Sequence, residues 1–401
     1  MPKISPKIAI AGCGPAGLSA ALALHLAGFR VELYEKLLSP VPLGSGLLLQ
    51  PTGLSVMRKL GLEGTLRARG NPIDRLRGIT MPSGRLALDV QYDALSAHPA
   101  GLAVHRAALF SVLHEAVCQA GIPIHAGFEL KSVSPTRSGE RCLISASGER
   151  TAAYGLVVDA TGTHSNLVTQ KRQQLQFGAL WATLDWPHDG PFRRSWLEQR
   201  YRRANVMLGV LPVGRIEPTG NKKLTLFWSL PHRDYDAWRA AGLDSWKASV
   251  LQIWPETDAI LGQINTAEQL TLAGYAHRTV ARPFACGLAH IGDAAHCTSP
   301  QLGQGANMAL LDAAALASAL ETYSDIDQAL RHYAKLRRLH VYLYQMMSLG
   351  LTPVFQSHGA TLPWLRDTLF APLSRWQPMQ KVLAATVAGV FAYPLSGLHL
   401  S

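Results

Sequence analysis

The chain of 401 residues has few cysteines. Their number and spacing do not favour a domain that is stabilised by disulfides or by zinc. The five cysteines are odd in number, and no two of them stand in a Cys-x-x-Cys spacing. Neither a disulfide framework nor a zinc site is therefore indicated. We expect a cytoplasmic protein without bound metal, because free thiols persist in a reducing compartment.

Long hydrophobic runs are also absent. The nearest approach, Val382 to Tyr393, is followed by Pro394 and falls well short of the roughly 20 apolar residues of a spanning helix. The first residues, Met1 to Pro6, are too polar for a secretory signal. We therefore expect neither a transmembrane segment nor a leader. With 48% hydrophobic residues, the chain can still bury a large core in two or three lobes.

Acidic side chains are in the minority, with 27 Asp and Glu against 38 Lys and Arg, which gives a formal net charge of +11. No recognition motif accompanies this charge, so we do not expect a nucleic-acid partner. An ordinary solvated basic face explains it, and attraction to an anionic substrate or a peripheral membrane contact are the alternatives. The basic clusters are Arg193–Arg194, Arg200, Arg202–Arg203 and Arg331 to Arg338.

A βαβ pattern near the N-terminus is the first informative feature that the sequence contains. The apolar stretch Lys7 to Ala11 predicts a buried strand, Leu18 to Leu26 a helix closed by Gly28, and Val31 to Tyr34 a second strand. A glycine-rich turn in this context is the fingerprint of a dinucleotide-binding unit. The sequence therefore predicts a Rossmann-like α/β domain.

The glycines of this turn have distinct physical roles. Gly12 permits the tight turn, Gly14 lets the backbone approach a pyrophosphate, and Gly17 allows close packing of helix on strand. Pro15 and Ala16 open the helix, whose free N–H groups favour phosphate. The acid that follows the second strand, Glu35 with Lys36 beside it, is placed to hold a ribose, whereas Glu32 falls within the strand.

A second motif lies almost 300 residues later. The short strand Leu288 to Ile291 leads into Gly292 and Asp293, and after Pro300 a glycine-rich turn enters the helix Ala306 to Leu320. A carboxylate leaving a strand suits a polyol chain, and bare backbone at a helix start suits an anionic ring system. The two motifs together indicate FAD. The residues of this turn are Gly303, Gln304, Gly305, Ala306 and Asn307.

These motifs carry a resemblance over essentially the whole chain. It resembles the class A flavoprotein monooxygenases, the p-hydroxybenzoate hydroxylase group, and within it the branch related to ubiquinone-biosynthesis hydroxylases. The resemblance implies a glutathione-reductase-type FAD-binding domain, an antiparallel β-sheet substrate domain and C-terminal helices. It also implies that Arg106, at the start of the helix Ala107 to Ala120, contacts the FAD phosphates.

Further roles are implied by the same resemblance. Asp293 would bind the ribityl or pyrophosphate region, and Pro300 with the turn 303–307 would follow the isoalloxazine ring. Gly44 to Gly46 resembles the loop beside that ring. One departure concerns the stretch that follows Asp159: Thr161 replaces an acid, and Val168 stands where the family has arginine. We expect FAD binding to survive this departure, while the reduction by NAD(P)H is less secure.

The pattern predicts a discontinuous FAD-binding domain. Residues 1–170 form its first part, with 76–98 joining the substrate sheet, and residues 276–320 return to complete it. The substrate domain occupies residues 171–275, and residues 321–401 form a helical region with breaks at prolines. The predicted strands and helix of the substrate domain are Leu175 to Leu184, Val206 to Pro212, Leu224 to Trp228 and Ser245 to Trp254; the prolines are Pro353, Pro363 and Pro372.

Aromatic side chains are frequent in the predicted substrate sheet, which suits a flat aromatic or apolar substrate. Core packing also explains most of them. No residue is assigned as a catalytic base. The aromatic residues are Trp181, Trp186, Trp196, Tyr201, Trp228 and Trp238, and the histidines considered are His98, His164, His232 and His296.

The resemblance implies an FAD-dependent monooxygenase that uses NAD(P)H and O₂ to hydroxylate an aromatic or apolar small molecule through a flavin hydroperoxide. An FAD-dependent reductase or dehydrogenase of an apolar substrate is the alternative, and the change at Thr161 favours it slightly. A flavin-holding binding protein without turnover is a third hypothesis. A flavin halogenase is not indicated, because its Trp-x-Trp-x-Ile-Pro signature is absent. The oligomeric state is left open.

Overall fold

The structure is a computed structural model of the chain. It describes residues 6–39, 45–95, 100–137, 139–359, 361–370, 373–374 and 376–392, and single residues up to 400. Of the sequence-based predictions, those for His98, Gly44 and Pro372 lie outside these residues. No helix among those described is long and apolar enough to cross a bilayer.

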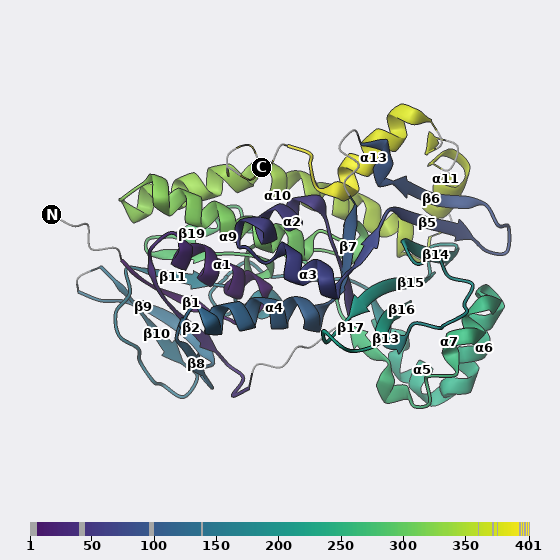
Figure 1. Cartoon of the computed structure of the whole chain (residues 1–401), viewed down its shortest axis with the longest axis horizontal. Coiled ribbons are helices and arrows are strands. Elements are labelled where there is room, and N and C mark those ends of the chain that lie inside the picture. Colours follow the sequence, from purple (N-terminus) through teal and green to yellow (C-terminus); the bar gives the residue numbers. More distant parts are fainter. Residues whose placement is uncertain are drawn as a thin grey trace.

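A six-stranded sheet, parallel apart from one edge strand, forms one end of the molecule (Figure 1). The βαβ unit predicted from the sequence is at its centre, because β1 (Lys7–Ala11) pairs with both β2 (Arg30–Glu35) and β11 (Leu156–Asp159). The turn after β1 holds the first glycine motif, and β20 (Leu288–His290) on the other side of β11 leads into the second. The edge strands are β19 (Phe284–Ala285) and β8 (Ile124–Ala126).

Alternation along β1 decides what covers each face of this sheet. Ile8 and Ile10 pack with the helices α1 (Pro15–Leu26), α4 (Arg106–Gln119) and α9 (Gly305–Thr322). Ala9 and Ala11 face the hairpin of β9 (Leu130–Pro135) and β10 (Arg141–Ser145). The helices predicted over Leu18 to Leu26 and Ala306 to Leu320 therefore bury apolar side chains against this face of the sheet.

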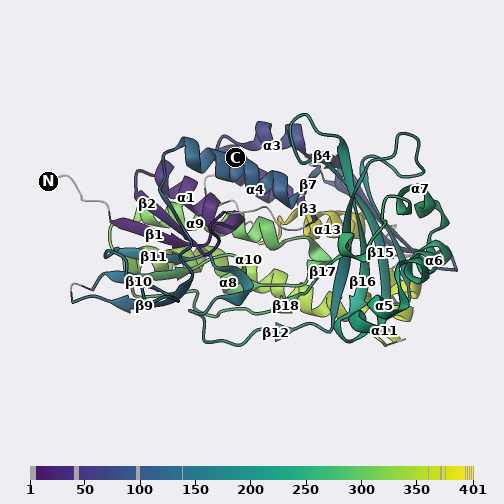
Figure 2. The same ribbon diagram turned by 90° about the horizontal axis from the view of Figure 1, so that it is seen from below.

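A seven-stranded sheet forms the opposite end, and Figure 2 shows it standing across the molecule. Its neighbours pair antiparallel, as predicted, except for β14 (Trp196–Arg202) and β5 (Arg75–Thr80), which run parallel. The helices α5 (Tyr235–Ala241), α6 (Leu243–Ile253) and α7 (Asp258–Leu261) cover its outer face. The other strands are β17 (Thr271–Ala273), β13 (Phe177–Asp185), β16 (Lys222–Pro231), β15 (Val206–Arg215) and β6 (Leu86–Gln91).

Smaller elements connect the two ends. The three-stranded sheet of β3 (Gly46–Leu49), β7 (Gly101–His105) and β4 (Asn71–Ile73) packs on β15 through a shared apolar cluster. Two more helices, α2 (Pro51–Lys59) and α3 (Glu63–Arg69), follow β3. Other short elements include β12 (Gln173–Gln174), β18 (Ala276–His277) and α8 (Asp293–His296).

The C-terminal region is helical, but two of the predicted breaks are wrong. Helix α10 (Ile326–Phe355) contains Pro353, and α11 (Thr361–Leu365) contains Pro363. Pro353 lies in the last turn of α10, where its missing N–H removes a single hydrogen bond, and the helix ends two residues later at Phe355. Helix α13 (Gln377–Ala388) then returns to pack beside β6 and β3.

Candidate functional site

The turn after β1 contains glycines that serve two different purposes. At Gly12, with φ of +104°, a Cβ atom would lie 2.5 Å from the carbonyl oxygen of Ala160, and at Gly17 it would lie 1.8 Å from that of Gly12. Both glycines are required by the packing of the protein itself. At Gly14 a Cβ would meet nothing within 4 Å, and this residue lines the main cavity. The space at Gly14 is thus left open.

Helix α1 presents an uncapped N-terminus to this space. Gly14 is its N-cap and offers no side chain, Pro15 is the first helical residue, and the first turn contains no acidic side chain. Pro15 and Ala16 line the cavity. The first N–H groups of a helix lack intrahelical partners and lie at the positive end of its dipole, so this end suits a phosphate.

Glu35 fixes the shape of the same turn. Its carboxylate accepts hydrogen bonds from the backbone N–H groups of Cys13 at 2.7 Å and Leu37 at 3.1 Å. Burial, and next the charge of Glu35, raise the pKa of the Cys13 thiol to about 12, so it stays protonated. Glu35 and the exposed Lys36 do not line the main cavity.

Glu32, the rival acid, is engaged elsewhere. It forms an ion pair with Lys7 at 2.6 Å and accepts hydrogen bonds from Tyr154 and His125. Burial would raise its pKa, but the hydrogen bonds from Lys7, Tyr154 and His125 lower it to about 2. Its carboxylate is therefore committed to partners of the protein.

The second motif meets the first at the end of the six-stranded sheet. Gly292 has φ of +59°, and a Cβ there would lie 2.9 Å from the Cβ of Ala16. Asp293 follows at the start of α8 and lines the cavity, with its carboxylate 3.5 Å from the Thr163 hydroxyl. The structure thus brings Ala16 and Asp293, which are 277 positions apart, to one edge of the sheet, as the strand order predicts.

The glycine-rich turn before α9 lies along the cavity, where Pro300, Gly303, Gln304, Gly305 and Ala306 all contribute to the wall. Gly303 adopts the left-handed conformation, with φ of +62°, which favours glycine. The N-terminus of α9 carries no side-chain cap. Open backbone is therefore presented at this wall, as at the start of α1.

Two side chains of this turn are occupied by the protein. Asn307 is fully buried and does not line the cavity; its carboxamide accepts from the N–H of Gln50 at 2.8 Å and donates to the carbonyl of Gly303 at 3.0 Å. Gln304 donates to the carbonyl of Val387 in α13 at 2.6 Å. Asn307 thus fixes the turn, and Gln304 ties it to the C-terminal helix.

Gly46 and Arg106 complete this part of the cavity. A Cβ at Gly46 would lie 2.5 Å from the hydroxyl of Thr225 in β16, so the loop and the seven-stranded sheet approach closely here. Arg106 begins α4, its N–H donates to the carbonyl of Ser45, and its exposed side chain lines the cavity. The buried His105 caps this helix by accepting from the N–H of Ala107.

Asp159 occupies the motif in which the sequence departs from the family. It is fully buried and accepts hydrogen bonds from Thr161, Ser165 and His290. Burial would raise its pKa, but the hydrogen bond and charge of His290 and the two hydroxyls lower it. Thr161 supplies a donor to this carboxylate, and an acid at 161 would instead repel it.

The cavity has a volume of about 540 Å³ and continues from the two glycine motifs to the seven-stranded sheet. Its far walls are apolar and come from the sheet, from the end of α10 and from α13. A single cavity therefore has a polar end that exposes backbone and an apolar end that suits a flat molecule. The apolar walls include Leu76, Ala87, Leu88, Ala179, Leu197, Met207, Leu211, Leu351, Val354, Met379 and Leu383.

Only two of the aromatic residues considered from the sequence, Trp181 and Tyr201, line this cavity. Trp228 packs instead against Trp246 on the other face of the sheet. Its neighbour Phe227 faces the cavity, because successive side chains of a strand point to opposite faces. The sequence reasoning missed the cavity-lining residues Phe227, Tyr275, Phe355, Gln199 and Gln356, and strand alternation could have found the first.

No histidine lines the cavity among the residues described. His164 is exposed beside Arg172, and burial together with that charge lowers its pKa. His232 lies near Gln174 at the surface. The histidines considered from the sequence that the structure describes therefore lie outside this cavity.

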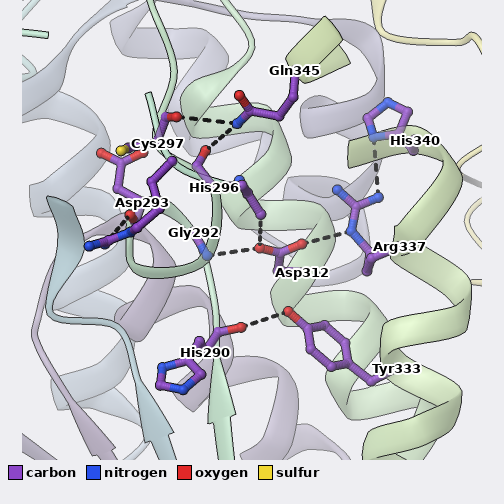
Figure 3. A network of polar contacts seen from close by, with 11 residues as sticks. His290, Gly292, Asp293, His296, Cys297, Asp312, Tyr333, Arg337, His340 and Gln345 are labelled. Carbon is purple, nitrogen blue, oxygen red and sulfur yellow. Dashed lines mark hydrogen bonds and ion pairs between the residues drawn. The ribbon is translucent and has the colours of Figure 1, made fainter. Parts of the chain in front are cut away.

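His296 instead belongs to a buried polar network that the sequence reasoning did not predict (Figure 3). At its centre, Asp312 of α9 accepts hydrogen bonds from the N–H of Gly292, from His296 and from Arg337 of α10. Burial would raise the pKa of Asp312, but the charges of His296 and Arg337 hold it at about 2. The network thus anchors the turn that presents Asp293.

The same network reaches the C-terminal helix. The Nδ1 atom of His340 lies 3.3 Å from Arg337 (Figure 3). Its Nε2 atom lies 3.1 Å from the carbonyl oxygen of Gly389. Because arginine can only donate, Nδ1 accepts and the Nε2–H donates. Burial, and then the charge of Arg337, lower the pKa of His340 to about 3, so it is neutral. The turn that presents Asp293 is therefore linked through this network to the end of helix α13.

Comparison with known proteins agrees with this geometry. A family model described as an FAD binding domain matches residues 6–342. The chain is 28% identical to 3-amino-4-hydroxybenzoate 2-monooxygenase of Streptomyces cremeus, over 82% of this chain and 83% of the relative. It is 24% identical to aurachin C monooxygenase/isomerase of Stigmatella aurantiaca, over 92% and 94%.

A solved structure gives the same fold. The tetrameric form of 2-methyl-3-hydroxypyridine-5-carboxylic acid oxygenase superposes with a TM-score of 0.78, covering 98% of both chains at 21% identity. The predicted fold class is therefore confirmed: an FAD-binding α/β domain, a predominantly antiparallel sheet domain and C-terminal helices.

The chain belongs to the FAD-binding family that this model defines. It is an FAD-dependent monooxygenase, and class A enzymes of this kind take their electrons from NAD(P)H. The residues fit the cofactor, since the space at Gly14, the open starts of α1 and α9 and the side chains of Arg106 and Asp293 all border one cavity.

Proposed function

We propose that this monooxygenase hydroxylates a flat, uncharged aromatic small molecule held between the glycine-rich turn 303–307 and the seven-stranded sheet. The observation that supports this best is the continuous cavity, whose apolar end is bordered by Trp181, Tyr201 and Phe227. Aromatic and aliphatic walls stabilise such a ligand by excluding water from both of its faces. The two similar enzymes are named for 3-amino-4-hydroxybenzoate and for aurachin C.

We propose the following positions for the cofactor. The pyrophosphate lies at the start of α1, against Gly14, Pro15 and Ala16, with Arg106 as its cationic partner. Glu35 and Lys36 serve the adenosine ribose, and Gly12 and Gly17 shape the turn. Asp293 holds the ribityl chain; the flavin ring lies along Gly46, Pro300, Gly303, Gln304, Gly305 and Ala306, with Asn307 supporting the turn beneath it.

When bound, FAD supplies the activation of O₂, and the chain supplies positioning and a dry environment. Tyr275 is placed to donate a hydrogen bond within the cavity, because its hydroxyl oxygen already accepts from the Nε1–H of Trp181 at 2.9 Å. Burial raises the pKa of Tyr275 to about 12, although the hydrogen bond from Trp181 lowers it in part. The hydroxyl of Tyr275 therefore stays protonated and can donate a hydrogen bond.

The test of this function is the consumption of NADPH and NADH by the FAD-loaded protein, with and without O₂, over a panel of phenols, quinolones and uncharged heteroaromatics. We expect one class of compound to accelerate an O₂-dependent oxidation of the nucleotide and to be converted. Conversion that persists without O₂ would overturn the proposal and favour a reductase. The same assay shows whether the chain with Thr161 and Val168 prefers NADH or NADPH.

Three finer assignments belong to the same proposal. The FAD-binding domain comprises residues 1–170 and 276–320, with 76–98 in the substrate sheet, and residues 171–275 and 321–401 form the substrate domain and the C-terminal region. A place in the branch related to ubiquinone-biosynthesis hydroxylases is supported by the apolar walls of the cavity. A cytoplasmic location is supported by the five cysteines, all of which are free.

We also propose a peripheral contact with an anionic membrane surface. The outer face of α10 carries four exposed apolar side chains, whose exposed fractions lie between 43% and 63%: Leu339, Tyr342, Met346 and Leu349. Three exposed basic side chains precede them in the same helix: Arg331, Lys335 and Arg338. Apolar and basic groups on one helix suit an interface rich in anionic lipid. We expect the protein to sediment with phosphatidylglycerol vesicles but not with phosphatidylcholine vesicles. The variant Tyr342→Glu should no longer sediment with phosphatidylglycerol vesicles. Equal sedimentation with both kinds of vesicle, or with neither, would contradict the proposal.

A further inference from the structure

One face of α10 is polar and packs against the segment that leads into Pro300. Gln345, Ser348 and Thr352 are spaced three and four residues apart, which places them on the same side of the helix. Gln345 is 2% exposed and Ser348 is 1% exposed. Buried polar side chains of a folded protein need partners, and these three find theirs in the residues just before Pro300.

The first contact on this face holds the backbone. The Nε2 group of Gln345 donates to the carbonyl oxygen of His296 at 2.9 Å and to that of Cys297 at 3.3 Å (Figure 3). The carbonyl oxygen of Cys297 also accepts from the N–H of Arg278 at 3.1 Å. The chain is therefore fixed to α10 as it leaves α8.

Four hydroxyl groups continue this contact. The hydroxyl of Thr298 donates to that of Ser348 at 2.7 Å, and the hydroxyls of Ser299 and Ser348 lie 2.8 Å apart. The hydroxyl of Thr352 lies 2.8 Å from that of Ser299 and 2.6 Å from the carbonyl oxygen of Ser348. Ser348 is thus bonded to both of the side chains that precede Pro300.

These contacts determine where Pro300 lies in the cavity. Thr298, Ser299 and Pro300 line the cavity, whereas Ser348 does not. Ser299 has an extended backbone, with ψ of 155°, and Pro300 begins the short turn that follows it. Because proline has no N–H, it cannot anchor this turn by donating a hydrogen bond. The anchor is supplied by the two hydroxyl residues before it, and through them by Ser348.

We propose that Ser348 is a positioning residue of the monooxygenase reaction. By holding Thr298 and Ser299, it sets the position of Pro300, along which the proposed function places the flavin ring. A misplacement of about 1 Å that originates far from the chemistry can lower a rate by about 100-fold. The inference rests on the proposed function for the place of the ring and adds to it a residue that does not line the cavity.

The test compares the FAD-loaded wild-type and Ser348→Ala proteins. Without substrate, the variant should keep its FAD content, because the pyrophosphate site at Gly14 is unchanged. Its visible absorption spectrum and the reduction potential of its flavin should shift, because the wall beside the ring has moved. With an active aromatic compound, kcat for hydroxylation should fall roughly 10- to 100-fold, while KM stays close to the wild-type value.

Variants of Thr298 separate the hydroxyl from the shape of the side chain. Thr298→Val loses the hydroxyl and should shift the spectrum in the same direction as Ser348→Ala. Thr298→Ser keeps the hydroxyl and should resemble the wild type. In the double variant Ser348→Ala/Thr298→Val, the shift should be no larger than in Ser348→Ala alone, because both substitutions break the same contact.

Thr257→Val is the matched control for the loss of a buried hydroxyl. Thr257 is fully buried in the turn between α6 and α7, and its hydroxyl donates to the carbonyl of Trp254 at 2.6 Å. This variant should lose stability in urea unfolding, because a buried hydrogen bond is removed. It should keep the wild-type spectrum, reduction potential and kcat.

The inference would be overturned by an unchanged spectrum and potential in Ser348→Ala, by additive shifts in the double variant, or by equal shifts in Thr257→Val. Loss of FAD from Ser348→Ala would also overturn it, because the residue would then serve cofactor binding or folding. Failure of the proposed function is separate. It appears as the absence of O₂-dependent product, whereas the spectrum and the potential are measured without substrate.

Discussion

The two ends of the cavity are built on different principles. The cofactor end exposes backbone at the starts of α1 and α9. Two of its residues, Gly12 and Gly17, must be glycine because a Cβ atom at either would lie within 3 Å of backbone atoms. The substrate end is made largely of apolar side chains on strands and helices. Backbone recognises a common cofactor, whereas side chains can vary with the substrate.

The largest expected effect separates binding from folding at the cofactor end. Gly14→Val should abolish FAD binding while the apoprotein stays folded, because a Cβ there meets only the open cavity. Gly17→Val should prevent folding, because its Cβ would overlap the carbonyl oxygen of Gly12. Bound FAD after saturation and circular dichroism distinguish the two outcomes. Normal flavin content in Gly14→Val would refute the assignment of the pyrophosphate site.

The next effect concerns the cation at the same end. Arg106→Met should weaken FAD binding by roughly 30- to 100-fold, since a charge-assisted hydrogen bond to a phosphate is lost. Titration of the apoprotein with FAD at two ionic strengths measures it. The control is Arg67→Met, an exposed arginine of α3 that pairs with Glu63 and should leave the affinity unchanged. Equal affinities for the wild-type and Arg106→Met proteins would remove Arg106 from the site.

The network between the two ends predicts a dependence of stability on pH. His340 is neutral in the folded protein, with its pKa lowered to about 3, while in the unfolded chain it takes up a proton below its ordinary value of 6.5. Stability is therefore lost as the pH falls from 6.5 toward 3, by about 2 kcal/mol at pH 5.

In His340→Gln this loss should shrink, because a carboxamide can accept from Arg337 and donate to Gly389 without titrating. Urea unfolding of the wild-type and variant proteins between pH 8 and 4 tests it. His332, on the same helix, is the control position, and His332→Gln should keep the wild-type slope. Parallel curves for wild type and His340→Gln would contradict the account.

The smallest expected effect lies at the substrate end. Ala179→Leu enlarges a side chain of β13 that lines the cavity, so the KM for the aromatic substrate should rise about tenfold, as expected for a few methyl groups in a pocket. The affinity for FAD should not change. A parallel loss of both affinities would show that the two ends are not independent.

Sequence reasoning succeeded where a backbone conformation restricts the residue type. Gly12 and Gly17 are visible as glycines because nothing else fits, and the strands around them alternate in a regular way. The substrate end was less predictable, because Phe227 and Trp228 are equally aromatic and only the register of the strand decides which one lines the cavity.

Asp312 and Gln356 could not be found from the sequence for a related reason. Asp312 stands in a helix recognised by its small residues, and its role depends on Arg337 and on a turn that only the tertiary structure brings to it. Gln356 is an ordinary glutamine after a long helix until the fold places it against the sheet. Neighbours that are distant in the chain, rather than the local sequence pattern, set the surroundings of both residues.

We propose that this cavity places an aromatic substrate where bound FAD activates O₂. The most direct test is turnover of the first active aromatic compound under ¹⁸O₂, with mass spectrometry of the product. We expect one ¹⁸O atom per product molecule, none when the label is supplied as H₂¹⁸O, and no product from the Gly14→Val protein. Product formed without O₂, or with its new oxygen from water, would contradict it.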